Sequence, residues 1–124
     1  MTTENKSIVQ RALAGLIETH DVDAVGRFLS DDFTHRRPGN VTKTKKEWLA
    51  AVEAALVPLA DMQVELLQLL SDGEYVVVHS RRWLPGGPET VVVDVCRLED
   101  GLIVDVWEII EPVATAAENL RWWE

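Results

Sequence analysis

The feature that most constrains this chain is a pair of apolar, β-branched runs joined by Asp100-Gly101, within residues 91–110. Such runs on either side of Asp-Gly are a strong signal for a β-hairpin, because Asp-Gly accepts the positive φ angles of a two-residue turn. The first run contains one carboxylate, Asp94, among four valines. An unpaired charge is expensive to bury in the middle of a sheet. Asp94 is therefore the first candidate for a functional residue.

Length and charge limit the kind of protein that this chain can be. A chain of 124 residues falls within the common size of one domain, so we expect a single domain over residues 1–124. The composition, 47% hydrophobic and 27% charged, is that of a folded globular protein. The net charge is −9 at pH 7. Nucleic acids and anionic membranes usually bind clustered Lys and Arg, so we expect neither as a partner.

Cysteine use and the N-terminus bear on the compartment. The single cysteine, Cys96, stands in an apolar strand pattern, which fits a buried, unreactive thiol in a reducing compartment. The first ten residues contain neither the basic nor the apolar region of a signal peptide, and no run approaches the roughly 18 apolar residues that span a bilayer. We therefore expect a cytoplasmic protein.

Two helices are expected at the start of the chain. Apolar residues recur at helical spacing over residues 7–17 and again over residues 22–29, where Asp21 is a candidate N-cap. The two helices would form a hairpin. Residues 33–36 then read as a short strand.

A third helix is expected to begin at Thr42 or Thr44. Glu47 lies three residues beyond Thr44, which is the spacing of a capping box, and Pro58 closes the helix. The chain from there to Pro112 reads as four strands separated by turns. They cover residues 62–70, 75–84, 89–99 and 102–110. Helices followed by an antiparallel meander predict an α+β fold, with a pocket where the curved sheet bends away from the helices.

The order of these elements and one motif resemble a known superfamily. The order is ααβαββββ, and the motif is Asp94-Val-Cys-Arg97-Leu-Glu-Asp-Gly101 followed by Trp107. Both resemble the nuclear transport factor 2-like superfamily and, within it, the SnoaL-like polyketide cyclase group, over nearly the whole chain. The resemblance implies a cone in which three helices pack on a curved antiparallel sheet. Its members include isomerases, cyclases, dehydratases, hydrolases and binding domains, so the resemblance implies no single reaction.

The turns predict which strand residues lie side by side. A two-residue Asp100-Gly101 turn places Asp94 opposite Trp107, and a symmetric turn over residues 85–88 places His79 opposite Asp94. The three side chains would then share one face of the sheet, roughly 5 Å apart at Cβ. A slip of one residue in either hairpin would move a member to the other face.

This constellation suits proton transfer. Burial raises the pKa of a carboxyl group and a neighbouring imidazolium lowers it, so Asp94 and His79 together could titrate near neutral pH. In the cyclase and isomerase relatives a pocket aspartate removes a proton next to a carbonyl, and the resemblance implies Asp94 as the acid/base and His79 as the hydrogen-bond donor. Trp107 would supply an apolar wall for a flat substrate. The alternative is that Asp94 and His79 form a structural ion pair.

Four further residues are candidates for binding a substrate. His35 resembles the histidine that many relatives place shortly before a proline at the pocket mouth, although here one extra residue precedes Pro38. The alternative for His35 is an exposed loop position. Trp48 and Phe28 lie on the apolar stripes of their helices, where they either border the cavity or belong to the core. Tyr75, at the start of its strand, is expected at the rim.

Two positions beside Trp107 depart from the family pattern. Val106 and Glu108 stand where many relatives carry His and Asp. Alternation along a strand puts Glu108 and Trp107 on opposite faces. We expect Glu108 to be solvated or paired with Arg81 or Arg97.

Motifs for cofactors are missing from the sequence. It has no glycine-rich phosphate loop, no paired-cysteine metal spacing and no Gly-x-Ser-x-Gly motif, so we expect neither a cofactor nor a metal. The first hypothesis is a small acid/base enzyme of the cyclase or isomerase type that acts on an apolar carbonyl compound. The alternative is a module that binds a small molecule or dimerises without catalysis.

The strands are apolar on both faces, for example over residues 66–70 and 91–95. One layer of helices covers only one face of a sheet, so a second cover is needed. We therefore expect a homodimer packed sheet to sheet, which the superfamily resemblance also implies.

Overall fold

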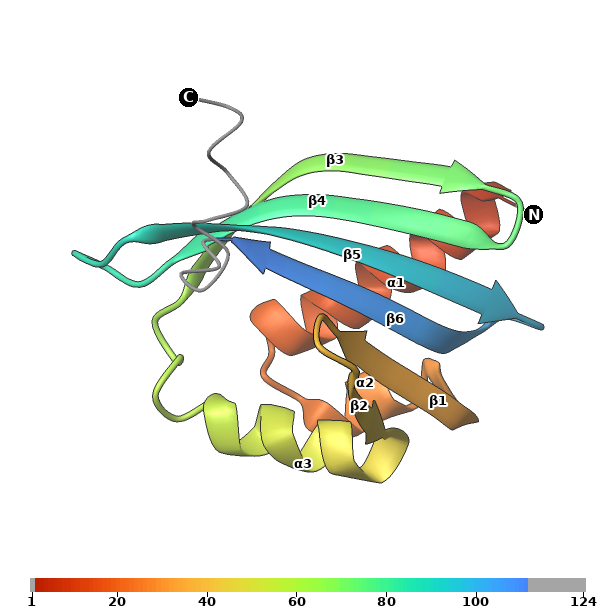
Figure 1. Cartoon of the computed structure of the whole chain (residues 1–124), viewed down its shortest axis with the longest axis horizontal. Coiled ribbons are helices and arrows are strands. Elements are labelled where there is room, and N and C mark those ends of the chain that lie inside the picture. The colour runs from red at the N-terminus through yellow and green to blue at the C-terminus, as the bar shows by residue number, and fades with distance from the viewer. Residues whose placement is uncertain (1, 112–124) are drawn as a thin grey trace.

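The computed structural model describes residues 2–111. Three helices pack on a curved, six-stranded sheet, which confirms the α+β cone (Figure 1). The helices are α1 (Thr2–Ile17), α2 (Val22–Gly26) and α3 (Lys45–Ala55). The strands are β1 (Leu29–Arg37), β2 (Val41–Thr44), β3 (Gln63–Asp72), β4 (Tyr75–Trp83), β5 (Glu89–Glu99) and β6 (Leu102–Glu111). None of the helices described is long and apolar enough to cross a membrane.

The strand order β2-β1-β6-β5-β4-β3 combines a meander with an added edge. Strands β3 to β6 form the expected antiparallel meander. Strand β1 follows the first two helices in the chain and lies beside β6, with which it pairs in parallel. Strand β2 pairs antiparallel with β1 and was not predicted, because its four residues, among them Thr42 and Thr44, resemble a helix start. Strand β1 therefore lies inside the sheet, between β2 and β6, rather than at its edge.

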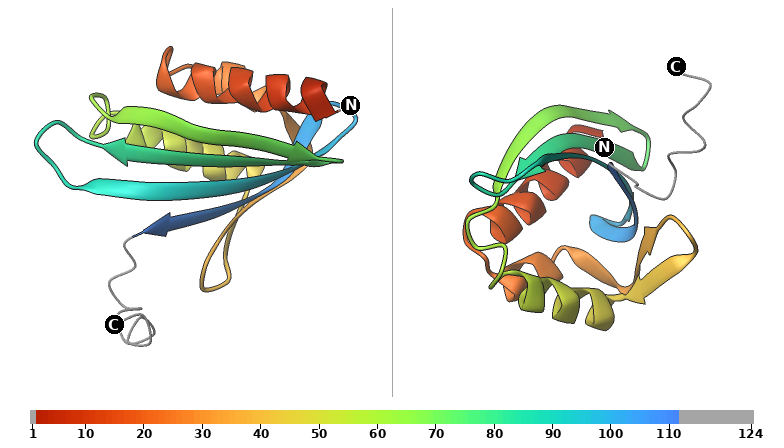
Figure 2. Two further views of the ribbon diagram at one scale, coloured as in Figure 1. Left: turned by 90° about the horizontal axis from the view of Figure 1, so that it is seen from above. Right: turned by 60° about the vertical axis from the view of Figure 1, so that its left-hand side comes forward.

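Helix α1 lies along the concave face of the sheet, whereas α3 lies beside β1 and β2 (Figure 2). Along β4 and β5 alternate residues face inward, so Val76, Val78 and Cys96 are buried against Val9 of α1. Burying one such aliphatic side chain stabilises the fold by roughly 1.5–3 kcal/mol. Cys96 is a free, buried thiol whose pKa burial raises, as expected of an unreactive cysteine.

The start of α3 confirms the predicted capping box. The Glu47 backbone N–H donates to Thr44 Oγ1 at 3.3 Å, and the Thr44 N–H donates to Glu47 Oε1 at 2.9 Å. Each partner satisfies a donor that the helix leaves without an intrahelical acceptor. The cap fixes where α3 begins and therefore where its Trp48 side chain stands relative to the sheet.

The predicted register of β4 and β5 is wrong by one residue. Strand pairing resumes at Trp83 opposite Glu89, so the loop between them holds five residues rather than a symmetric four. Val78, and not His79, is the partner of Asp94. His79 therefore lies on the outer face of the sheet, away from the helices, with Nδ1 3.3 Å from Gln68 Oε1.

The register of β5 and β6 is wrong for a different reason. The Asp100-Gly101 turn forms as predicted, with positive φ at both residues. Beyond it, Arg97 pairs with Asp105 whereas Leu98 pairs with Ile103, so Val104 is an extra residue in β6. This is a β-bulge, and it shifts every later partner by one. The bulge puts Glu108 opposite Asp94 and moves Trp107 to the outer face.

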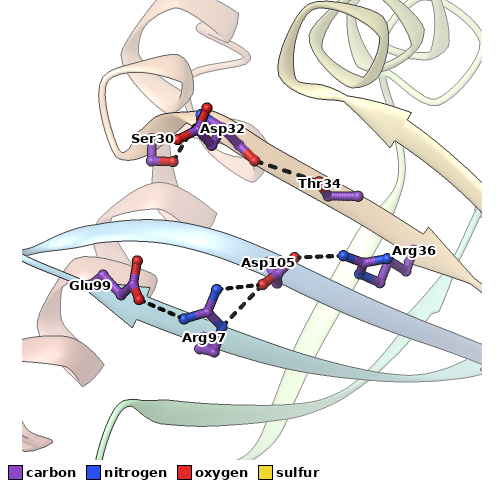
Figure 3. A network of polar contacts seen from close by, with 7 residues as sticks. All are labelled: Ser30, Asp32, Thr34, Arg36, Arg97, Glu99 and Asp105. Carbon is purple, nitrogen blue, oxygen red and sulfur yellow. Dashed lines mark hydrogen bonds and ion pairs between the residues drawn. The ribbon is translucent and has the colours of Figure 1, made fainter.

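The bulge also sets up an ion-pair network on the outer face (Figure 3). Arg97 donates from Nε and Nη2 to Asp105 Oδ2 at 3.0 and 2.8 Å, and Arg36 Nη2 donates to Oδ1 at 3.2 Å. Asp105 is only 7% exposed. Arg97 lies on the face of β5 opposite to that of Asp94, and it links β5 to β6, whereas Arg36 links β1 to β6.

The outer face keeps apolar side chains at its surface. Leu70 is 57% exposed and Ile109 is 49% exposed. Their strand partners, Val77 and Val93, face the same side and are only partly buried. The sheet-to-sheet homodimer stays a prediction.

Candidate functional site

A pocket lies between the concave face of the sheet, the end of α1 and the length of α3. Its outer chamber has a volume of about 310 Å³, at the lower end of the ~300–1,000 Å³ range of ligand sites. A smaller inner chamber of about 80 Å³ lies deeper in the core. The residues that line both chambers are Leu16, His35, Trp48, Arg82 and Glu108. Only the inner chamber is lined by Asp94.

The centre of the site is a chain of two carboxylates and one guanidinium. Asp94 and Glu108 are strand partners on β5 and β6, and Arg82 projects from β4 on the same face. Arg82 Nη2 donates to Asp94 Oδ2 at 3.1 Å, and Arg82 Nη1 lies 3.5 Å from Glu108 Oε2. One guanidinium therefore holds both acids. The expected pairing of Glu108 with Arg81 or Arg97 is wrong, because those arginines lie on the outer face.

Asp94 is unusual among the carboxylates of residues 4–111. It is 6% exposed, and burial raises its pKa to about 7, helped by the charge of neighbouring Glu108 and opposed by that of Arg82. Loss of water around a carboxylate favours its neutral form, and a second negative charge nearby acts in the same direction. Near neutral pH, Asp94 is therefore able both to accept and to release a proton.

His35 lies on β1, beside Glu108 and against α3. Its Nε2 is 3.8 Å from Glu108 Oε1, and its ring stacks on Trp48 with centroids 5.3 Å apart and planes inclined by 21°. Burial lowers the pKa of His35, which is 5% exposed, and Glu108 partly opposes this shift. A neutral imidazole carries one N–H donor and one acceptor nitrogen. His35 therefore offers a hydrogen bond to a ligand at neutral pH.

Two more cations stand at the entrance. Arg37 Nε is 3.7 Å from Glu108 Oε1, and Lys43 is the strand partner of His35 on β2. Both line the outer chamber. Among residues 4–111, no three His, Cys, Asp or Glu side chains cluster as ligands for a metal ion. The described groups are suited to proton transfer and to binding of polar atoms in an otherwise apolar pocket.

The family follows from the sequence match, which agrees with this fold. A model of the SnoaL-like domain matches residues 9–106. The chain belongs to the SnoaL-like family. The matched part of this SnoaL-like chain runs from α1 into β6 and includes Asp94, His35, Arg82 and Trp48.

Solved structures share the SnoaL-like fold across most of their length. A nuclear transport factor 2-like protein of unknown function from Mesorhizobium loti has a TM-score of 0.76 at 16% identity, covering 90% of this chain and 93% of its own. A proposed ketosteroid isomerase from Kribbella flavida has a TM-score of 0.76 at 18% identity, and the match covers 90% of this chain and 81% of the isomerase. IdmH, a proposed polyketide cyclase from Streptomyces antibioticus, has a TM-score of 0.68 at 20% identity, and the match covers 87% of this chain and 95% of IdmH. No curated protein sequence matches significantly. These likenesses establish the fold and not the reaction.

The structure brings together three of the residues singled out from the sequence of this SnoaL-like chain. Asp94, His35 and Trp48 line the pocket. The alternative of an exposed loop for His35 is wrong, because β1 pairs with β6 and places His35 on the concave face. The roles of all three in binding or catalysis remain predictions.

The other four candidates lie outside the pocket. His79, Trp107 and Tyr75 are on the outer face, where Trp107 packs 5.6 Å from the Arg36 guanidinium. The register shifts described above moved His79 and Trp107 there. Phe28 lines neither chamber and packs against the core instead.

Arg82 and Glu108 are the site residues that sequence reasoning missed. Arg82 continues the alternation of Val76, Val78 and Ser80, whose side chains are buried. The sequence alone does not show this alternation, because Val77 makes both faces of β4 apolar there. Burial in the structure identifies the inward face and places Arg82, and not His79, on the side of Asp94.

Proposed function

We propose that this protein is a cofactor-free acid/base enzyme of the cyclase or isomerase type, acting on an apolar carbonyl compound with Asp94 as the proton-transfer group. The observation that carries the proposal is a buried carboxyl group with a pKa of about 7 inside an apolar chamber. A general base works best when its pKa lies near the working pH. Most aspartates have a much lower pKa, so near neutral pH they are fully ionised and are weaker bases than Asp94.

The proposed step is removal of a proton from a carbon next to a carbonyl. Asp94 Oδ2 is held by Arg82, so the carboxylate has a fixed orientation. The guanidinium beside it places positive charge where the enolate forms, and neutral His35 can donate a hydrogen bond to the enolate oxygen. Return of the proton from Asp94 to another carbon of the substrate completes an isomerisation. These roles replace the one that the sequence suggested for His79.

A second candidate function is binding without catalysis. The inner chamber holds about 80 Å³, which leaves room beside Asp94 for only a small part of a ligand. In that case Asp94, Arg82 and Glu108 would be a structural network at the base of a binding pocket. This alternative predicts saturable binding without proton exchange.

Solvent deuterium exchange separates the two functions. An enolisable ketone such as β-tetralone is incubated with the protein in deuterium oxide, and loss of the proton next to the carbonyl is followed by NMR. We expect the wild type to accelerate exchange and Asp94→Asn to reduce that acceleration by about 100-fold or more, the usual contribution of an acid/base residue. His79→Gln, on the outer face, is the control and should exchange like the wild type. Equal exchange with Asp94→Asn and the wild type would contradict the proposed mechanism.

A further inference from the structure

We propose that the ligand of this pocket is an amphipathic organic anion, such as an aromatic or alicyclic carboxylic acid, whose anionic group binds at Arg37 and Lys43. We call these two residues the cationic rim. The inference rests on the pocket of the proposed function and deepens it by naming the substrate class. The apolar body would lie along α1 and α3, with its uncharged, reacting end toward Asp94.

The charge of the pocket differs from that of the protein. The chain has a net charge of −9, with 21 acidic and 12 basic residues. The outer chamber is nevertheless lined by Arg37, Lys43 and Arg82 and by a single carboxylate, that of Glu108. Arg82 is already bound to Asp94 in the inner chamber. The outer chamber therefore has an excess of positive charge.

The cationic rim is placed by two adjacent strands. His35 and Lys43 are partners on β1 and β2, and Arg37 follows His35 by two residues, so the three side chains share one face. The charges of Arg37 and Lys43 both oppose protonation of His35 and so help to lower its pKa. Both cations are thus close enough to the imidazole for their charges to repel its protonated form. Neither lines the inner chamber.

The rim cations are only partly neutralised by the rest of the described chain. Arg37 is 48% exposed, and its Nε is 3.7 Å from Glu108, beyond good hydrogen-bond distance. Lys43 makes no ion pair with any of residues 4–111. Cations at the edge of a low-dielectric cavity attract an anion more strongly than cations in open water. A carboxylate or sulfonate there would gain two partners.

The apolar wall fits the rest of such a molecule. Apart from its charged residues, the outer chamber is lined largely by apolar side chains from α1, α3 and the segment that follows α3. They are Leu16, Ile17, Val52, Leu56, Leu59 and Met62. A pocket with one charged end and apolar walls orients a ligand as well as binding it. The anionic group stays at the rim, and the opposite end reaches toward Asp94.

The test compares two fluorescent probes with nearly the same ring system. Anilinonaphthalene sulfonate carries a negative charge, and N-phenylnaphthylamine does not. Both are titrated into the whole protein, its Lys43→Gln and Arg37→Gln variants, and their double variant. We expect the Kd of the sulfonate to rise about 3- to 10-fold for each single variant, the range for a partly exposed ion pair. The Kd of the neutral probe should change by less than about 2-fold.

Two controls assign the effect to the pocket. Lys46→Gln removes the same charge from an exposed position of α3 that lines neither chamber, and it should leave both Kd values unchanged. Ala51→Trp places a large side chain on the exposed surface of α3 where it borders the outer chamber, and it should weaken both probes. Circular dichroism and thermal melts confirm that each variant is folded.

Failure of this inference is distinguishable from failure of the proposed function. Asp94→Asn should bind the sulfonate at least as tightly as the wild type does, because it leaves the cationic rim intact and removes the carboxylate that neutralises Arg82. The inference is overturned if Lys46→Gln weakens the sulfonate as much as Lys43→Gln does, or if both probes respond equally to loss of the rim. It is also overturned if Ala51→Trp leaves sulfonate binding intact. None of these outcomes depends on turnover.

Discussion

Asp94 and Glu108 face each other directly across β5 and β6, and both bind the guanidinium of Arg82. Two carboxylates this close resist simultaneous ionisation, so one of them tends to hold a proton. Burial raises the pKa of Asp94 to about 7. The protonation state of this pair links the stability of the fold to the chemistry proposed for the pocket.

The first prediction concerns stability as a function of pH. The folded-state pKa of Asp94 is raised to about 7, above the ~3.9 of an unfolded aspartate. The folded state then holds the proton more tightly, so this contribution is full below about pH 4 and is lost as the pH rises to about 7. Urea unfolding should show the wild type losing roughly 2–3 kcal/mol relative to Asp94→Asn between about pH 5 and pH 8.

The comparison with Asp94→Asn separates this effect from that of His35. The pKa of His35 is lowered in the folded state, so its contribution has the opposite sign and is lost as the pH falls below about 6.5. His35 is present in both proteins, and its effect largely cancels in their difference. A pH-independent difference between the two would show that Asp94 does not titrate in this range.

The second prediction concerns Asp105 in the outer-face network. Asp105→Ala leaves Arg97 and Arg36 without their shared partner in a partly buried site. Breaking a buried ion pair by removing one member costs about 3–5 kcal/mol, and partial exposure of the arginines should reduce this to about 2–3 kcal/mol. Denaturant unfolding measures the loss. Glu99→Ala removes only the exposed contact of Arg97, and a change above about 1 kcal/mol there would be unexpected.

The third prediction concerns the cap of α3. Thr44→Ala removes the acceptor for the Glu47 N–H and should lower the free energy of unfolding by about 1 kcal/mol. Thr44→Ser keeps the hydroxyl and should retain most of this stabilisation. Thr42→Ala, an exposed neighbour in β2, serves as the control. Equal losses at positions 42 and 44 would indicate strand propensity rather than capping.

The fourth prediction concerns the homodimer. Light scattering at micromolar concentration should give twice the 13.9 kDa mass of one chain. Ile109→Lys puts a charge on the exposed apolar face of the sheet and should shift the mass to that of a monomer. Val57→Lys, an 83% exposed position after α3, is the matched control and should remain dimeric. A wild-type monomer would contradict the prediction.

Most of the secondary structure could be predicted from the sequence, because each element carries a local signal. The apolar spacing of residues 7–17, the Thr44 and Glu47 cap and the Asp100-Gly101 turn act within a few residues. Asp94 also stands out in the sequence alone, because it is a lone acid in a valine-rich strand. The family resemblance, confirmed by the domain match, added the overall arrangement.

Only the tertiary structure decided which side chains meet Asp94. The Asp100-Gly101 turn formed as predicted, yet the extra residue Val104 in β6 places Glu108, and not Trp107, opposite Asp94. The five-residue loop between β4 and β5 places Val78, and not His79, opposite Asp94, and Arg82 then lies on the same face as Asp94. Side chains alternate with a period of two, so a shift of one residue exchanges the faces of a strand completely. A bulge is set by packing against the rest of the sheet, and the residues beside it carry no local sign of it. The sequence by itself therefore determined that a buried acid exists, and the packing of the whole sheet determined its partners.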